Sequence, residues 1–347
     1  MGMNIPSRSG GQPTLEDVAR EATVSTATVS RCLNSPEQVS AKTRERVMAA
    51  VERLRYTPNF GARALAAKRT NTFGAIIPTM DNAIFARGLQ AFQEALSVRN
   101  ATMLVASTNY DPDLEEKQIR NLVARGADGL LLIGDDRPEA VYDLLRERGI
   151  PVVVAWALSE RPGVSCVGFD NRLAARQLAD AALALGHRTV AMISAHTKSN
   201  DRARARLEGI RQSMTANGID PKSLRLVETN YSIKRGMEAA IGMLRDGQRP
   251  TLIMCGNDVL AAGAVMGAKS LGLDVPGDVS VTGFDDIELA MLTEPGLTTV
   301  HVPHRQMGRA AAQLLLDHDD SGMNKLVCLD TSIVERGSLS RHVPGSA

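Results

Sequence analysis

The stretch TLEDVAREATVSTATVSRCLN, residues 14–34, predicts two short helices joined by a four-residue turn. Thr14 fits a helix N-cap, and Asp17 three residues later completes a capping box. Ser25 ends the turn and caps the second helix, which we expect over residues 26–33. Apolar residues recur on one side of each helix, so both are expected to pack on a shared core.

A third helix is expected after the first two. It begins at about Lys42, with Ser40 as its N-cap, because apolar residues recur at helical spacing at Val47, Val51 and Leu54. Three short helices with a tight turn between the first two are typical of a helix-turn-helix domain, whose second helix enters the DNA major groove. The alternative for this stretch is a small structural three-helix bundle.

The second helix exposes small polar side chains and one guanidinium, which can approach phosphates and base edges without steric clash. The candidate DNA-binding residues of this helix are Thr26, Ala27, Thr28, Ser30 and Arg31. The charge distribution favours the same interpretation. The first 70 residues carry eleven Lys and Arg against six Asp and Glu, whereas the remainder carries 29 against 33. A basic small domain joined to an acidic large one suits a polyanion at one end.

Six motifs along the chain resemble those of the LacI family of bacterial transcription regulators, in the same order and spacing. They are DVAREATVSTATVSRCLN (17–34), VSAKTRERVMAAVERLRYTPN (39–59), ALAAKRTNTFGAIIP (64–78), GHRTVAMI (186–193), CGNDVLAAGA (255–264) and VSVTGFDD (279–286). The resemblance extends from Thr14 to about Gly337. Family members often have Gly where this chain has Thr23, and a longer base-reading side chain where it has Ala27. Base discrimination is therefore expected to fall on Thr26 and Arg31, with Arg31 reading a guanine.

The resemblance also implies the domain organisation. We expect a disordered arm (1–13), a helix-turn-helix domain (14–58), a hinge helix (59–71), a two-lobed effector-binding and dimerisation domain (72–338) and a C-terminal tail (339–347). A hinge of this length is marginal alone and needs a partner surface to fold. The resemblance implies that two hinge helices pair in the DNA minor groove, where Leu65 wedges between base steps. The alternative is that Leu65 packs on the core.

From Thr72 onward, short apolar runs alternate with helical stretches, which predicts a parallel α/β sheet. The expected strands fall in two sets, 73–78, 101–107, 129–133 and 151–155, then 188–194, 224–229, 251–256 and 279–283. Two α/β halves place a ligand at the carboxyl ends of their strands. The resemblance identifies the halves as a type I periplasmic-binding-protein-like core. It implies three crossings between lobes, with segments near 301–317 and 325–334 completing both.

Polar and aromatic groups follow several predicted strands and suit a polyol, because aromatic faces pack on sugar rings while Asp, Asn and Arg bond hydroxyls. By resemblance, the effector contacts fall on Ile84, Phe85, Trp156, Arg206, Tyr231, Asn257 and Asp285. Arg202 lies one helical turn before Arg206 and adds a second guanidinium to the same face. The pair suggests an anionic effector, a sugar acid or phosphate sugar. The stretch NSPEQVS (34–40) is similar to regulators that respond to gluconate-type sugar acids.

Each of these residues has a structural alternative. Arg206 can be a surface helix residue, Asn257 and Asp285 can be turn or N-cap residues, and Phe85 can belong to the core. His301 and His304 flank a proline without a third ligand, so no metal site is expected, and no cofactor. The four scattered cysteines, without a C-x-x-C motif, indicate neither a zinc site nor a disulfide framework.

The sequence therefore predicts a transcriptional regulator of the repressor type that acts on carbohydrate or sugar-acid catabolism genes. A homodimer would bind a near-palindromic operator, and a small molecule between the lobes would control its affinity. We expect a cytoplasmic protein without a membrane segment. One alternative is a sugar-binding protein of a transport system. Another is an enzyme, but the chain has no G-x-G-x-x-G, P-loop, nucleophile elbow or metal-ligand spacing.

Overall fold

The computed structural model describes residues 12–57, 69–81, 83–318 and 324–342, and divides the chain into two compact units with the boundary between Thr70 and Asn71. The predicted arm up to residue 11, most of the hinge including Leu65, and the last five residues lie outside the described residues. We call the first unit the head and the second the body.

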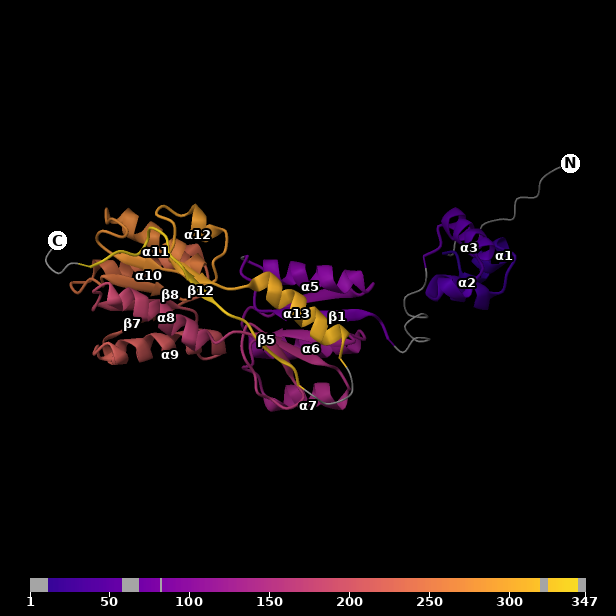
Figure 1. The fold of residues 1–347 in the computed structure, drawn as a ribbon, viewed down its shortest axis with the longest axis horizontal. Coiled ribbons are helices and arrows are strands. Elements are labelled where there is room, and N and C mark those ends of the chain that lie inside the picture. Colours follow the sequence, from indigo (N-terminus) through magenta and orange to yellow (C-terminus); the bar gives the residue numbers. More distant parts are fainter. Residues whose placement is uncertain (1–11, 58–68, 82, 319–323, 343–347) are drawn as a thin grey trace. The chain divides into compact units, whose positions relative to one another are not determined.

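The described part of the head is a small helical bundle (Figure 1). Its elements are α1 (Leu15–Glu21), α2 (Thr26–Asn34), the 3-10 helix η1 (Pro36–Gln38) and α3 (Ala41–Leu54). The predicted capping box is confirmed, since the Asp17 amide donates to Thr14 Oγ1 and the Thr14 amide donates to Asp17 Oδ2. Buried Val18, Val29 and Val47 each come from a different helix and join them in one core.

One expected cap of the head takes a different form. Ser40 is the N-cap of α3, but its side chain accepts no backbone N–H bond. The hydroxyl donates to Thr43 Oγ1 instead, at 3.0 Å. The turn before α2 is strained at Thr23, whose φ of 51° lies in the left-handed region that β-branched residues rarely adopt. This is the position at which related proteins were expected to carry glycine.

The body contains two α/β lobes. The first lobe is a six-stranded parallel sheet in the order β11-β5-β4-β3-β1-β2. Its strands are β1 (Thr72–Ile77), β2 (Thr102–Ser107), β3 (Gly129–Ile133), β4 (Val152–Ala155), β5 (Ser165–Gly168) and β11 (Leu326–Cys328). Its helices are α5 (Ala86–Val98), α6 (Pro112–Ala124), α7 (Glu139–Glu147) and α13 (His304–Leu316). Helices α5 and α13 lie together on one side of this sheet, and α6 and α7 lie on the other (Figure 1).

The second lobe is a four-stranded parallel sheet in the order β7-β6-β8-β9. Its strands are β6 (Val190–Ser194), β7 (Arg225–Glu228), β8 (Leu252–Cys255) and β9 (Ser280–Thr282). Helices cover both faces, namely α8 (Asn171–Ala184) with α9 (Asp201–Ala216), and α10 (Ile233–Arg245) with α11 (Asp258–Ser270). The remaining elements are η2 (Pro221–Ser223), α12 (Leu289–Leu292) and an antiparallel pair, β10 (Thr299–His301) and β12 (Ser332–Val334).

The expected three crossings between the lobes are confirmed. They follow β5, β10 and β11 (Figure 1). All eight expected strands are present, with bounds within two residues of those expected. Strand β5 was not expected, because its sequence SCVG is short and lacks a β-branched run. The expected segment 325–334 divides into β11, which completes the first sheet, and β12, which pairs with β10.

Candidate effector site and DNA-binding surface

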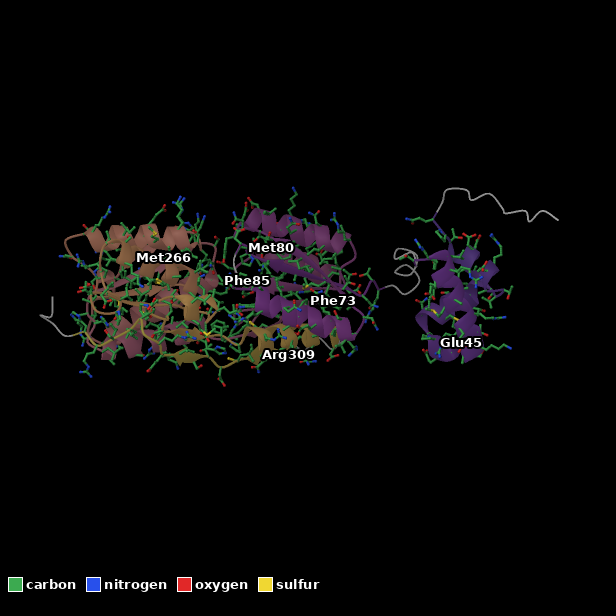
Figure 2. The ribbon with its side chains drawn as sticks, turned by 90° about the horizontal axis from the view of Figure 1, so that it is seen from above. Glu45, Phe73, Met80, Phe85, Met266 and Arg309 are labelled. Carbon is green, nitrogen blue, oxygen red and sulfur yellow. The ribbon has the colours of Figure 1, made fainter. Side chains whose placement is uncertain are left out.

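A small cavity lies between the two lobes, and its walls come from both. Its volume is about 20 Å³, room for about one water molecule. The residues that line it are Ile84, Phe85, Tyr110, Trp156, Asn200, Arg202, Arg206, Tyr231 and Asp285. Seven of the eight predicted effector residues are therefore brought together. Phe85 lies where the lobes face each other (Figure 2).

Aromatic side chains form two parts of the wall. Phe85 and Trp156 meet edge to face, with ring centroids 5.4 Å apart. The rings of Tyr110 and Tyr231, one from each lobe, lie 5.7 Å apart. Burial raises the pKa of both tyrosine hydroxyls, so each remains a hydrogen-bond donor at neutral pH.

Arg206 lies buried at the centre of the site, and each of its nitrogens is bonded to the protein. Nε donates to Asn171 Oδ1 at 2.9 Å, Nη1 to the Gly256 carbonyl at 2.6 Å, and Nη2 to Asp285 Oδ1 at 3.4 Å. The guanidinium also lies over the Phe284 ring, 3.7 Å from its centroid. The charge is compensated by Asp285 and the side chain is held in one orientation.

A second carboxyl group lies close to Asp285. Asp258 is fully buried at the start of α11, and its oxygens accept bonds from Thr299 Oγ1 at 2.6 Å and the Ile287 amide at 2.8 Å. Burial, together with the nearby Asp285 carboxylate, raises the pKa of Asp258 to about 8. Asp258 is thus largely neutral at pH 7.

Arg202 differs from Arg206 in its partners. It is 8 % exposed, and its Nη1 donates to Asp201 Oδ1 at 2.7 Å. Within the described part of the chain, its Nε and Nη2 make no hydrogen bond. Asp201 also accepts the backbone N–H of Asp135 at 2.6 Å, which joins α9 of the second lobe to the loop after β3. A Cβ on Gly134 in this loop would lie 1.6 Å from Arg202 Nη1, so only glycine admits the guanidinium.

Asn257, the eighth predicted effector residue, does not line the small cavity. It is the N-cap of α11, where its Oδ1 accepts the Leu260 amide at 2.9 Å. Its buried Nδ2 has no partner within the described residues. The N-cap alternative is therefore part of its role, and one donor is left available.

A larger cavity of about 580 Å³ adjoins the small one and shares Tyr231 with it. This volume lies within the range of small-molecule sites. Asp81 and Arg87 line it from the first lobe, and Val259 and Glu288 line it from the second. Arg87 and Glu288 form an ion pair of 3.0 Å across the cavity, with both side chains exposed.

The structure divides the predicted DNA-binding residues of α2 into two groups. Thr28 Oγ1 bonds Ser25 Oγ at 2.9 Å, and Ser30 Oγ accepts from Asn34 at 3.2 Å. Thr26, Ala27 and Arg31 are exposed, and the Arg31 side chain has no partner in the described part of the head. Thr26 and Arg31 are thus exposed side chains of α2, whereas the hydroxyls of Thr28 and Ser30 are engaged within the head.

Comparisons with known proteins agree with this arrangement. Residues 70–327 match the family model of periplasmic binding proteins and the sugar binding domain of the LacI family, and residues 14–59 match that of bacterial regulatory proteins, lacI family. The chain belongs to the LacI family. It is a DNA-binding transcriptional regulator with an effector-binding domain, and its relatives are regulators rather than enzymes.

Two curated relatives and one solved structure illustrate how far the LacI-family likeness extends. Catabolite control protein A of Priestia megaterium is 31 % identical over 93 % of this chain and 96 % of its own length. The regulator GntR of Escherichia coli K12 is 32 % identical over 88 % of this chain and 91 % of its own. The lac repressor dimer bound to operator and the anti-inducer ONPF superposes with a TM-score of 0.81 at 28 % identity, over 95 % of this chain and all of that one.

Sequence reasoning missed Tyr110 as part of this LacI-family site, did not single out Asn200 and gave His304 no role. Tyr110 follows β2, so the rule that finds residues after strands would have found it. Asn200 is the N-cap of α9 and lines the cavity beside Arg202. His304 carried no local signal, because its partners are distant in sequence. In the described chain, no group of three or more His, Cys, Asp or Glu is placed to hold a metal ion, and no helix is long and apolar enough to cross a bilayer.

Proposed function

We propose that this LacI-family regulator is a homodimeric repressor whose operator affinity is controlled by a sugar, sugar acid or phosphate sugar bound between the lobes. The observation that carries the proposal is a cavity with walls from both lobes, in which buried Arg206 and Asp285 face Phe85 and Trp156. A ligand that touches both walls biases the position of one lobe against the other. The protein acts in the cytoplasm, where a bacterial regulator meets its DNA.

The DNA-binding half of the proposal assigns base recognition to Thr26 and Arg31 and assigns phosphate contacts to Thr28 and Ser30, with Ala27 close to the groove floor. Leu65, outside the described residues, is proposed as the minor-groove wedge of the hinge (59–71). The first lobe holds the last residue of this hinge, because the Asn71 amide donates to Asp128 Oδ2 at 2.6 Å. A change in the first lobe therefore acts on the C-terminal end of the hinge.

The effector is proposed to be an anionic polyol. Arg206 is already bonded through Nε, Nη1 and Nη2, so it orients rather than neutralises a ligand. Arg202 retains Nε and Nη2 on a planar edge that matches a carboxylate or phosphate bidentately. Tyr110, Tyr231 and Asn257 supply donors for hydroxyl groups, and the Phe85–Trp156 wall suits the apolar face of a sugar ring.

Effector and operator are then linked by a coupling free energy, and the linkage is reciprocal. If gluconate changes operator affinity by a given factor, operator changes gluconate affinity by the same factor. The inner cavity has room for about one water molecule, and we propose the larger cavity, which shares Tyr231 with it, as the way in for the effector.

The test combines DNA binding with calorimetry. Fluorescence anisotropy with duplexes from the gene's own upstream region is expected to show salt-sensitive, sequence-selective binding that gluconate changes. Calorimetry is expected to show tighter binding of gluconate than of glucose, and Arg202→Gln is expected to abolish the difference. Arg211→Gln is the matched control, because Arg211 is exposed on the same helix and does not line the cavity. Tighter binding of glucose would refute the anionic class, and the absence of selective DNA binding would refute the regulator.

A further inference from the structure

Five residues form a closed circuit of hydrogen bonds across the two lobes, and His304 completes it. Trp156 Nε1 donates to His304 Nδ1 at 3.0 Å, and His304 Nε2 bonds the Asp285 carbonyl oxygen at 3.1 Å. Arg206 bonds the Asp285 carboxylate and Asn171 Oδ1. Asn171 Nδ2 returns to the Trp156 carbonyl at 2.9 Å.

The circuit crosses between the lobes at two different connections. Trp156 follows β4 in the first lobe, while Arg206 and Asp285 belong to the second lobe. Asn171 begins α8 directly after the first crossing, and His304 begins α13 directly after the second. Three members line the effector cavity, whereas Asn171 and His304 do not. These two residues therefore contact the side chains and backbone of cavity-lining residues rather than a ligand.

The partners of His304 fix its protonation. The indole N–H is only a donor and the backbone carbonyl is only an acceptor, so Nδ1 must be bare and Nε2 must carry the proton. The ring is 3 % exposed, and burial lowers the pKa of His304. A neutral imidazole with one defined tautomer is thus the form that connects the two lobes.

We propose that His304 is a positioning residue for effector recognition, because it holds Asp285 of one lobe and Trp156 of the other at a fixed separation. This inference rests on the proposed function, since it concerns the same cavity. Through Asp285 the effect reaches Arg206, the guanidinium at the centre of the site. Removing the imidazole opens the circuit at two bonds and frees both cavity walls.

Backbone geometry at both ends of the imidazole supports this role. Trp156 has φ of 62° and Asp285 has φ of 99°, both in the region that L-residues rarely adopt. Such conformations persist only where the surroundings impose them. A Cβ on Gly88 of helix α5 would lie 2.4 Å from the indole ring and 3.2 Å from the His304 carbonyl oxygen, so the glycine leaves room for Trp156 and α13 to pack there. The imidazole thus bonds two strained residues directly.

The experiment uses the full chain and its single tryptophan, which gives one indole resonance. His304→Leu removes both bonds, whereas His304→Gln keeps one acceptor and one donor on a side chain of similar reach. His301→Leu is the matched control, because His301 is half exposed on the same connection and bonds Asp286 outside the circuit. The readouts are the indole N–H shift and its solvent exchange, gluconate and glucose affinity by calorimetry, and a thermal melt to check folding.

We expect His304→Leu to shift the indole resonance and to accelerate its solvent exchange. We also expect the affinity for the sugar that the wild type binds to fall about tenfold, which corresponds to the loss of one well-made hydrogen bond. His304→Gln is expected to recover most of both effects, and His301→Leu to leave them unchanged. An unchanged indole resonance in His304→Leu, or unchanged affinity with a shifted resonance, overturns the inference. If the wild type binds neither sugar, the proposed effector class fails, while the ligand-free indole signal still decides whether His304 holds Trp156.

Discussion

Replacing Gly134 by alanine tests whether the contact between α9 and the loop after β3 holds the lobes together. Gly134 has φ of 76°, and a Cβ there would lie 1.6 Å from Arg202 Nη1 and 2.6 Å from Asp201 Oδ1. Neither distance is sterically possible, so Arg202 must move away. Gly149 provides the matched control, because its φ is 63° and a Cβ there would meet nothing within 4 Å.

Both substitutions place an alanine in a left-handed backbone conformation, but only Gly134→Ala also removes a side-chain contact. A left-handed backbone costs an alanine roughly 1–2 kcal/mol, and the stiffer unfolded chain returns about 0.4–1 kcal/mol. Gly149→Ala should therefore lose about 1 kcal/mol of unfolding free energy. Gly134→Ala also displaces the Asp201 carboxylate, which is 19 % exposed, accepts from Arg202 within α9 and accepts the Asp135 amide across the lobes. A hydrogen bond to a charged group contributes about 1.5–3 kcal/mol, so Gly134→Ala should cost more by about that amount.

Urea unfolding followed by Trp156 fluorescence measures both variants, because the chain contains a single tryptophan and it is buried between the lobes. The slope of the transition should stay constant, so that the midpoints report stability. Gluconate affinity measured in parallel should fall in Gly134→Ala and stay near the wild-type value in Gly149→Ala. Equal losses of stability in the two variants would refute the argument that Gly134 makes room for a contact that joins the lobes.

Three further substitutions test other parts of the molecule. Thr23→Gly should stabilise the head by about 0.5–1 kcal/mol, because it relieves a left-handed β-branched residue, and slower amide exchange in α1–α3 of the full chain would show it. Arg31→Ala should relax base preference at one position of each operator half-site at a cost of about 1–3 kcal/mol, whereas uniform weakening on all sequences would mark a phosphate contact. Asp258→Asn tests the pH dependence of stability, because the Asp258 carboxyl has a pKa of about 8 in the folded protein and of about 4 in the unfolded chain. Wild-type stability should therefore contain a component that falls from pH 4 to pH 8, and urea midpoints at pH 5 and pH 8 should differ less in the variant.

Most of the fold was predictable from local pattern. The strands are apolar runs bounded by helical stretches, and the helix N-caps of the head, Thr14 and Ser25, are recognisable in the sequence. The miss at β5 has a physical cause. This strand is stabilised by pairing with β4 and with β11, which lies about 160 residues later, so its four residues need little intrinsic preference of their own.

The candidate site was predictable to the extent that parallel strands bring their carboxyl ends together. What the sequence did not distinguish was the state of each group. Arg202 and Arg206 look equivalent one turn apart on a helix, yet Arg206 is bonded by Asp285 and Gly256 from distant segments, and Arg202 keeps free donors. Likewise, His304 is in the sequence only one of two histidines that flank Pro303, and its role depends on Trp156, which precedes it by 148 residues.

The return of the chain to the first lobe bears on how the protein emerges from the ribosome. Helix α13 and strand β11 come from the last fifth of the sequence, yet α13 packs on Phe73, Leu131 and Val153 of strands made far earlier. While the second lobe is being translated, the first lobe is incomplete, because an apolar face of its sheet is uncovered and its edge strand β11 is missing. Such a waiting intermediate is prone to aggregate, so chaperone demand should peak late in synthesis and fall once residues near 328 have left the exit tunnel.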